Sequence, residues 1–385
     1  MKLAGIVSWS ILVVLIDVAF ARVAFGALVP SLRSGLGLDL AAVGAVASAN
    51  SIGYLLTSAF AAQLERLVGV RRLAIGSHLL AAAAFAGVAF APGFVPLIVM
   101  RFLSGAGGGG GVVAAQRIAL DAVPPERRVL VSTITWSGVG LGLIAAGVAL
   151  PALSSPQSWR AASLVCAIIA LVVALTTPAP AAVARASAAS EPPAWRWQNE
   201  ARVLAAYALF GMGFLAYNTF AAVSSLHASP GARFLLLGFA AIVGTLLAMR
   251  VRQAELGMGA GLILGAAGAM LTLAHMQLAG DLLIGLGFGP VPGFATAILR
   301  QRAGTAAAMS AIALSTIAVG AGQIAGPIVA GMAAQNLGIA WVAGIAAVAY
   351  FLGFLLIVAD ALARIHLKVP ASPARDFSAR ATSSS

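Results

Sequence analysis

The amino-acid sequence predicts an all-α polytopic membrane protein whose twelve transmembrane helices fall into two six-helix halves. Of its 385 residues, 61% are hydrophobic and 9% are charged, which is more apolar surface than a soluble core can bury. The apolar residues form segments of about 20 residues, the length at which a helix crosses a bilayer. Positive charges gather in alternate connections between these segments.

Six apolar segments precede the longest polar interruption of the chain. In the first of them, Asp17 breaks the apolar run, but apolar residues continue to Val29, which favours a retained helix over a cleaved signal peptide. Arginine-containing connections separate most of the later ones. The six segments span approximately residues 6–29, 41–62, 73–91, 94–115, 129–150 and 161–177.

Six further segments follow the interruption, and they are again separated by short connections, several of which carry arginine. They span approximately residues 201–226, 232–249, 258–278, 281–299, 305–333 and 338–360. The chain therefore divides into an N-terminal six-helix bundle at 1–177, a cytoplasmic linker at 178–200 rich in Pro, Ala and Ser, a C-terminal six-helix bundle at 201–360 and a disordered cytoplasmic tail at 361–385.

The distribution of Lys and Arg predicts the topology. If the amino terminus is cytoplasmic, only Arg33, Arg160 and Arg233 lie in outer connections, while the cations outside the apolar segments otherwise lie inside. This asymmetry predicts both termini in the cytoplasm and a location in the bacterial cytoplasmic (inner) membrane. It also accounts for the net charge of +12 without a nucleic-acid partner.

A glycine-rich stretch in the fourth segment matches the spacing of a dinucleotide phosphate loop. Gly105, Gly107 and Gly110 form G-x-G-x-x-G, but they lie within an apolar run, with no acidic residue about 20 positions later to hold a ribose. We therefore expect these glycines to let membrane helices approach closely.

The organisation and several motifs resemble the major facilitator superfamily. The run from Arg101 to Gly107 is similar to its R-x-x-x-G-x-G pattern. The loop Leu64–Arg72 resembles its cytoplasmic signature, with Arg66 where that signature has an aspartate. More narrowly, three stretches resemble the YbfB/YjiJ branch: Arg22–Pro30, Asn50–Tyr54 and Tyr207–Phe220. The resemblance implies alternating access, coupling to protons and a site between the halves near the bilayer midplane.

Few ionisable side chains lie within the segments, and each is costly in a bilayer and so a candidate site residue. Counting along the helices puts Asp17 roughly 16 Å and Arg22 roughly 24 Å from the inner face, and Arg101 roughly 10 Å from the outer face. The two arginines are then similar in depth and could flank one cavity. Asp17 and Arg22, five residues apart, do not share a helix face.

Asp17 is the expected proton-coupling residue, with Arg101 adjusting its proton affinity; the alternative is that Asp17 caps polar groups in a helix interface. Arg22 and Arg101 are expected to hold a carboxylate or another anionic group. The alternative is that they reach towards the membrane surface or bond to carbonyls between helices. The predicted substrate-binding residues are Arg22, Arg101, Asn50, Tyr54, Tyr217, Asn218, Thr219 and Gln323.

The second half is expected to contain no deep charge, with Asp281 at an outer helix end and Asp360 at an inner one. Its site residues would then be neutral. The four histidines, His78, His227, His275 and His366, lack metal-ligand spacing and are expected to be ordinary interfacial residues near helix ends or in loops. Cys166 is the only cysteine, so neither an intrachain disulfide nor a cysteine metal cluster can form.

The sequence contains no paired nucleophile and base, no metal cluster and no phosphate loop, so we expect a protein that is not an enzyme and binds no metal or cofactor. The predicted function is secondary active transport of a small organic solute, coupled to protons, with efflux by antiport favoured. One alternative is proton-coupled uptake of an organic anion, and another is a transporter-like membrane sensor without flux. The expected partners are the solute, protons and lipid, and the protein is expected to be a monomer.

Overall fold

The computed structural model describes residues 3–153, 155–179, 196–225 and 228–368, and its regular structure in these ranges is entirely helical. Twelve helical stretches are long and apolar enough to cross a membrane, which confirms the predicted fold class. They are Leu3–Phe20, Leu40–Val68, Val70–Phe90, Phe94–Asp121, Leu130–Leu153, Ser158–Leu175, Trp197–Phe220, Pro230–Ala248, Ala254–Leu273, Gln277–Gly304, Ser310–Leu337 and Trp341–Arg364.

The first six spans contain two interruptions. The first span changes from α-helix to π-helix at Leu15, and the fifth is divided at Ser137. Gly69, with φ of 83°, reverses the chain between the second and third spans, a backbone conformation that favours glycine. The elements are α1 (Leu3–Val14), η1 (Leu15–Phe20), η2 (Val23–Leu28), α2 (Val29–Leu36), α3 (Leu40–Val68), α4 (Val70–Phe90), α5 (Phe94–Asp121), η3 (Pro125–Arg127), α6 (Arg128–Trp136), α7 (Gly138–Ala149), η4 (Leu150–Leu153) and α8 (Ser158–Leu175).

In the second set of six spans, one long helix contributes to two crossings. It bends at Gly304, where φ is 72°, so that it completes the tenth span and forms the eleventh. The elements are η5 (Trp197–Glu200), α9 (Ala201–Phe220), α10 (Pro230–Ala248), α11 (Ala254–Leu273), α12 (Gln277–Phe288), α13 (Pro290–Leu337) and α14 (Trp341–Lys368).

The last helix ends later than the sequence predicts. α14 continues to Lys368, so the prediction of a disordered tail from residue 361 is wrong for residues 361–368. An ion pair one helical turn apart, between Asp360 and Arg364 at 3.2 Å, supports the extra turns. Residues 369–385 and most of the predicted linker, 180–195, lie outside the described residues.

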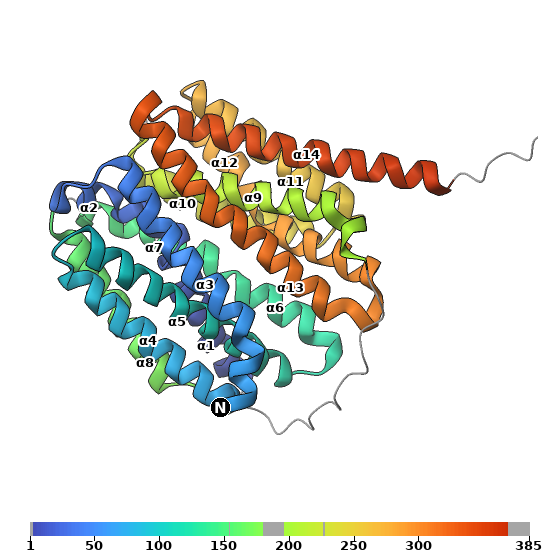
Figure 1. The fold of residues 1–385 in the computed structure, drawn as a ribbon, viewed down its shortest axis with the longest axis horizontal. Helices are drawn as coiled ribbons and strands as arrows, with labels where there is room; N and C mark the ends of the chain where they lie inside the picture. Colours follow the sequence, from blue (N-terminus) through green and yellow to red (C-terminus); the bar gives the residue numbers. More distant parts are fainter. Residues whose placement is uncertain (1–2, 154, 180–195, 226–227, 369–385) are drawn as a thin grey trace, which may run out of the picture.

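Helices pack first with neighbours in the same half of the chain. In the first half α5 packs on α3 and α4, and α4 on α8; in the second, α9 packs on α13 and α14, and α11 on α12 and α14. The two sets meet where α3 lies beside α13, α7 beside α10 and η2 beside α9 (Figure 1). The break in the first span therefore lies at the contact between the two sets.

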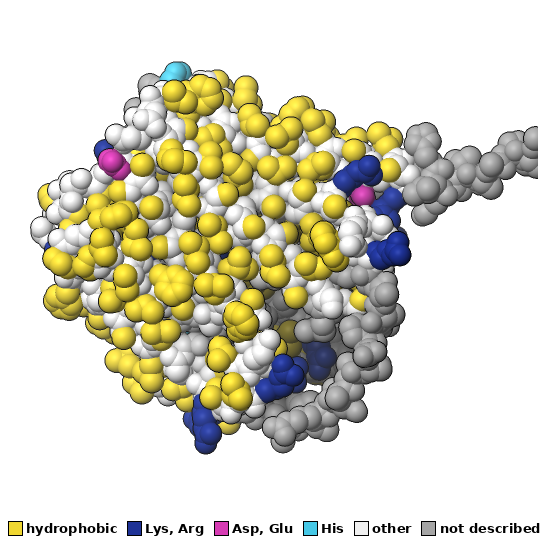
Figure 2. Space-filling model, viewed as in Figure 1, with side chains coloured by type: hydrophobic (Ala, Val, Ile, Leu, Met, Phe, Trp, Pro, Cys, Tyr) yellow, Lys and Arg dark blue, Asp and Glu magenta, His cyan; other side chains and the backbone are white. Residues whose placement is uncertain are grey.

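The outer surface suits a hydrocarbon environment. Figure 2 shows hydrophobic side chains across the middle of one face, with Lys, Arg, Asp and Glu confined to its edges. Large apolar side chains are exposed on several helices, including Phe60 at 57%, Ile168 at 62% and Phe239 at 61%. Such exposure is costly in water but not against lipid, so the chain is a multi-pass membrane protein.

The glycines of α5 serve close helix packing, as predicted. A Cβ atom at Gly105 would overlap the backbone carbonyl of Asn50 in α3. One at Gly107 would lie 2.6 Å from the carbonyl oxygen of Ser77 in α4, again closer than a real Cβ approaches. Two helices therefore approach α5 closely enough to touch its backbone, which is the behaviour of small-residue faces in membrane bundles.

This packing predicts that Gly105→Ala lowers thermal stability, because the added methyl would push α3 away from α5. Overpacking costs about 1–3 kcal/mol, so we expect the Tm of the purified protein to fall by several degrees. Gly76→Ala is the matched control, because Gly76 is exposed in α4 and a Cβ there meets nothing within 4 Å. An equal loss in both variants, measured by fluorescence-detected thermal unfolding, would contradict the packing account.

Candidate functional site

The first membrane span ends in a π-helical turn, and the irregular backbone that follows leaves one carbonyl without its helical donor. Residues 15–20 form a π-helical turn, in which the Ala21 amide donates to the Ile16 carbonyl at 3.0 Å. A 3-10 segment begins at Val23, where the Phe25 amide donates to the Arg22 carbonyl at 3.4 Å. Because the Phe25 amide is used in this way, the carbonyl of Ala21 lacks its usual helical donor. Such irregular turns are frequent at functional sites.

Arg101 of α5 supplies the missing donor. Its Nη2 donates to the carbonyl of Ala21, and its guanidinium lies 4.2 Å from the centre of the Phe25 ring. Arg101 also lines a cavity of about 20 Å³, room for about one water molecule, with Phe85 and Cys166 among its other walls. The sequence analysis predicted that Arg101 adjusts the proton affinity of Asp17. These contacts of Arg101 are with other residues.

Arg22 lies at the contact between the two sets of helices. Its Nη1 donates to Oε1 of Gln323 in α13 at 2.9 Å, and its guanidinium lies 3.8 Å from the centre of the Tyr54 ring in α3. The residue is 7% exposed, and its Nε has no hydrogen-bond partner. Within the described ranges, no carboxylate forms an ion pair with it. Three of the predicted binding residues, Arg22, Tyr54 and Gln323, thus come together in one cluster.

Asp17 lies in the π-helical turn and faces His78 of α4, with Oδ2 3.0 Å from Nε2. Both side chains are 0% exposed. The other ring nitrogen of His78, Nδ1, lies 2.7 Å from the carbonyl oxygen of Ala74, and the edge of Trp9 contacts the ring. The expectation that His78 is an ordinary interfacial histidine is therefore wrong: it is a buried partner of Asp17.

The depth of His78 is the signal that sequence reasoning missed. Counting from Val70, the start of α4, puts His78 roughly 12 Å into the span at 1.5 Å per residue. A histidine at this depth needs partners for both ring nitrogens, so His78, like Asp17, is a candidate site residue. Its partner was harder to identify, because 61 residues separate the two positions in the chain.

The remaining neutral candidates bond to nearby helices. Asn50 donates to the Arg101 carbonyl at 3.2 Å and to Ser104 Oγ at 3.0 Å, which ties α3 to α5. Asn218 and Thr219 donate to carbonyls one turn earlier in their own helix, α9. The structure therefore does not join these three residues to the Arg22 cluster, although the Oδ1 atoms of Asn50 and Asn218 have no hydrogen-bond partner.

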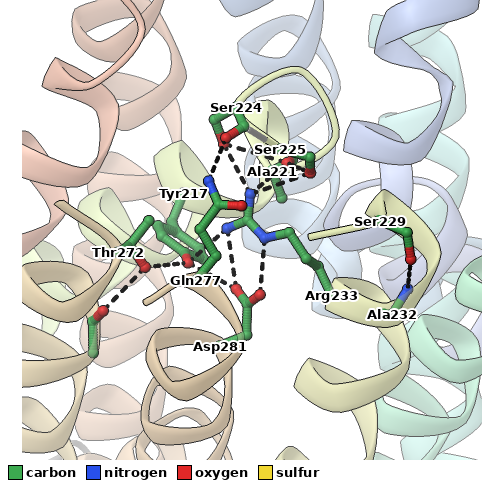
Figure 3. Close-up of polar contacts among 11 residues, drawn as sticks. Tyr217, Ala221, Ser224, Ser225, Ser229, Ala232, Arg233, Thr272, Gln277 and Asp281 are labelled. Carbon is green, nitrogen blue, oxygen red and sulfur yellow. Dashed lines mark hydrogen bonds and ion pairs between the residues drawn. The ribbon is translucent and has the colours of Figure 1, made fainter. Parts of the chain in front are cut away.

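A second buried charge pair lies in the second half, where none was expected. Arg233 of α10 donates through Nε to Asp281 Oδ2 of α12 at 2.8 Å, and both side chains are 0% exposed (Figure 3). The Tyr217 hydroxyl donates to Asp281 Oδ1 and accepts from Arg233, both at 2.7 Å. Asp281 lies about one turn from the start of α12, near a helix end as the sequence predicted, but its burial against Arg233 was not expected, and Tyr217 is held in this network.

The same network closes the end of α9. Arg233 Nη1 donates to the Ala221 carbonyl at 2.7 Å and to Ser224 Oγ at 3.0 Å, which satisfies backbone and side-chain acceptors just after the helix. Gln277 at the start of α12 donates to the Ser224 carbonyl at 2.7 Å (Figure 3). These bonds fasten the adjoining ends of α9, α10 and α12 to one another.

Asp360 belongs to a third charged cluster. Arg302 pairs with Glu200 at 2.8 Å, Glu255 at 3.1 Å and Asp360 at 2.8 Å, and Arg364 pairs with Glu200 at 3.1 Å. The cluster joins η5, α11, α13 and α14. In the described part of the chain, no group of three or more His, Cys, Asp or Glu side chains gathers that could hold a metal ion.

The sequence matches the family described as "Uncharacterised MFS-type transporter YbfB" over residues 14–359. Curated relatives include the 4-hydroxybenzoate transporter PcaK of Pseudomonas putida, 26% identical over 152 residues, and the hexuronate transporter of Bacillus subtilis (strain 168), 28% identical over 155 residues. Each alignment covers 40% of this chain, and 34% and 36% of the respective relative, so the chain matches about a third of their length.

The fold is also that of solved transporters. A crystal structure of the nucleoside transporter NupG superposes with a TM-score of 0.75 at 13% sequence identity, covering 94% of this chain and 99% of that one. An identity this low speaks to the fold alone. It agrees with the twelve-span architecture and with the resemblance to the major facilitator superfamily.

The Arg233–Asp281 pair predicts a large asymmetry between single and double variants. Asp281→Ala leaves a buried guanidinium without its anion, which should cost about 3–5 kcal/mol and lower the Tm markedly. Replacing both charges, as in Arg233→Met with Asp281→Leu, removes the uncompensated charge and should recover most of that loss. Thermal unfolding of the two variants checks this; a double variant no more stable than the single one would contradict it.

Proposed function

Because the chain belongs to the YbfB family of MFS-type transporters, we propose that it moves a small organic anion across a membrane by alternating access, coupled to protons. Its family and fold are those of transporters and not of enzymes. The observation that carries the proposal is Arg22, a buried guanidinium at the contact between the two halves whose hydrogen-bond partner in the second half is the neutral Gln323.

The chemistry of Arg22 favours an anion. A cation within a membrane costs at least a few kcal/mol unless a negative charge or a strong dipole compensates it. Gln323 occupies Nη1, while one edge of the guanidinium carries Nε, which is buried without a hydrogen-bond partner. That edge suits bidentate binding of a carboxylate. The Tyr54 ring stabilises the cation from its face.

The position of the cluster supports alternating access. Arg22 lies in the first half and Gln323 in the second, so their hydrogen bond must change when the halves rock against each other. An anion bound at Arg22 would alter the balance between the two arrangements, which is what a transported substrate has to do. The same position argues against the sensor alternative, because a sensor needs no contact that alternates between two open faces.

The names of two relatives agree with this choice of substrate. Both 4-hydroxybenzoate and a hexuronate are small carboxylates. We therefore favour proton-coupled uptake of an organic anion over the efflux by antiport that the sequence suggested. Asp17 remains the proposed proton-coupling residue, and a cytoplasmic location of both termini in a bacterial inner membrane remains part of the proposal.

Arg22→Gln should reduce transport of a carboxylate at least tenfold, because it removes the positive charge while retaining a polar side chain. The assay uses the purified protein in proteoliposomes, with labelled 4-hydroxybenzoate and glucuronate as probes and pH gradients of both signs. Arg250→Gln is the control, since Arg250 is exposed between α10 and α11 and should leave transport unchanged. Saturable transport by Arg22→Gln at the rate of the unsubstituted protein would overturn the assignment of Arg22.

The sign of the gradient response distinguishes the two directions. Symport predicts accumulation of the anion when the outside is acidic, whereas antiport predicts accumulation when the inside is acidic. Binding of a probe, detected as a rise in Tm, without flux under either gradient would favour the sensor.

Asp17→Asn should separate transport from its driving force. The amide cannot carry the coupled proton, so accumulation driven by a pH gradient should fall to background, while exchange of the probe at equal pH should remain measurable. Full accumulation in Asp17→Asn would show that another group couples the proton.

A further inference from the structure

We propose that Asp17 and His78 together form a binding site for a single proton, which is shared between Asp17 Oδ2 and His78 Nε2. The inference deepens the proposed function, since it assigns the coupled proton to a pair of residues. The role of this proton in transport rests on the proposed function, whereas the binding of the proton by the two residues does not. His78 thereby becomes a proton-binding residue that the sequence analysis did not assign.

The contact of His78 with a backbone carbonyl determines which ring nitrogen carries a hydrogen. A backbone carbonyl can only accept a hydrogen bond, so the 2.7 Å contact with the Ala74 carbonyl requires a hydrogen on Nδ1. In a neutral imidazole that leaves Nε2 as an acceptor. A carboxylate oxygen is also an acceptor, and two acceptors do not rest 3.0 Å apart in a dry site. A single proton between the two atoms would remove this repulsion, and neither atom has another hydrogen-bond partner.

The proton can be written in two ways with the same total charge. It belongs either to a carboxylic acid facing a neutral imidazole or to an imidazolium facing a carboxylate. Both forms of the pair are neutral overall, which suits its complete burial. Loss of the proton leaves one negative charge and a repulsive contact, so the unprotonated pair should separate or admit water.

Few other groups near Asp17 and His78 could compensate the negative charge that remains when the proton leaves. Among the described residues, Arg22 on the same span and Tyr54 of α3 are the groups that interact electrostatically with Asp17. The neighbouring helix α5 places Gly108 and Gly111 against the pair, and Trp9 of α1 packs against the His78 ring. The nearest compensating cation is thus Arg22, the residue proposed to bind the anion.

This placement makes proton and anion binding mutually dependent. When the pair is protonated and neutral, Arg22 has no negative charge to balance it and attracts an anion. When the pair has lost its proton, its negative charge can be balanced by Arg22, which then holds an anion less strongly. Proton and anion therefore bind together and leave together, which is the behaviour of a symporter.

The test measures the proton directly and needs no transport substrate. Protein labelled with ¹⁵N-histidine is reconstituted in lipid and titrated in nuclear magnetic resonance experiments. The chain has four histidines, and the His78 signal is assigned by its loss in His78→Gln, with His275→Gln, an exposed site, as the matched control. We expect Nδ1 of His78 to stay protonated throughout, and Nε2 to change in one step as the pH rises.

Asp17→Asn should abolish that step, because the amide donates a hydrogen bond to Nε2 and the imidazole stays neutral. Infrared difference spectra should show a protonated carboxyl, or an imidazolium with its carboxylate, that is lost in the same step. The proposal is overturned if Nδ1 of His78 carries no hydrogen, or if His78 titrates identically in Asp17→Asn. If 4-hydroxybenzoate and glucuronate are not transported while the step is observed, the substrate assignment fails and the proton site stands.

Discussion

A charge inside an oily bundle must be compensated, and this constraint organises the interior of the molecule. Removing an ionised group from water costs several kcal/mol or more, whereas a pair can remain buried if its geometry is good. Arg233 meets the constraint through Asp281, and Asp17 meets it through His78. Arg22 and Arg101 are different, because their partners are neutral: Gln323 and the Tyr54 ring for Arg22, and the Ala21 carbonyl and the Phe25 ring for Arg101. The incompletely compensated cations therefore mark the proposed site, and the paired charges Arg233 and Asp281 lie in the scaffold around it.

Glycine makes the pairing of Asp17 possible. A Cβ atom at Gly111 would lie 2.7 Å from Asp17 Oδ2 and 2.8 Å from His78 Nε2, in the space that the two side chains occupy. A Cβ at Gly108 would lie 3.2 Å from the Asp17 carbonyl oxygen. The glycine run of α5 thus has two roles that follow from one property, since the absence of side chains brings helices together and also leaves room for a polar pair between them.

Hydropathy was sufficient to predict the twelve spans, because each span is a local run of apolar residues whose length is set by the bilayer. Depth counting also selected Asp17, Arg22 and Arg101, all of which are buried in the structure. Pairing was not predictable in this way. Asp17 and His78 are 61 positions apart and Arg233 and Asp281 are 48 apart, so only the packing of helices brings them together. The break at Ala21 was not predictable either, because no proline or glycine, the residues that usually interrupt a helix, occurs between Leu15 and Phe25.

The break also explains how two sites with different chemistry can act together. In a regular helix Asp17 and Arg22 would point in different directions and belong to one rigid rod. Here Asp17 lies in the π-helical turn and Arg22 at the junction with the 3-10 segment, while Arg101 holds the carbonyl between these two helical forms. A change in helix type at this junction would turn both side chains at once without moving the rest of the span. Because η2 contacts α9, such a change would also reach the second half. The irregular backbone from Leu15 to Leu28 therefore connects the proposed proton site, the proposed anion site and the second half of the chain.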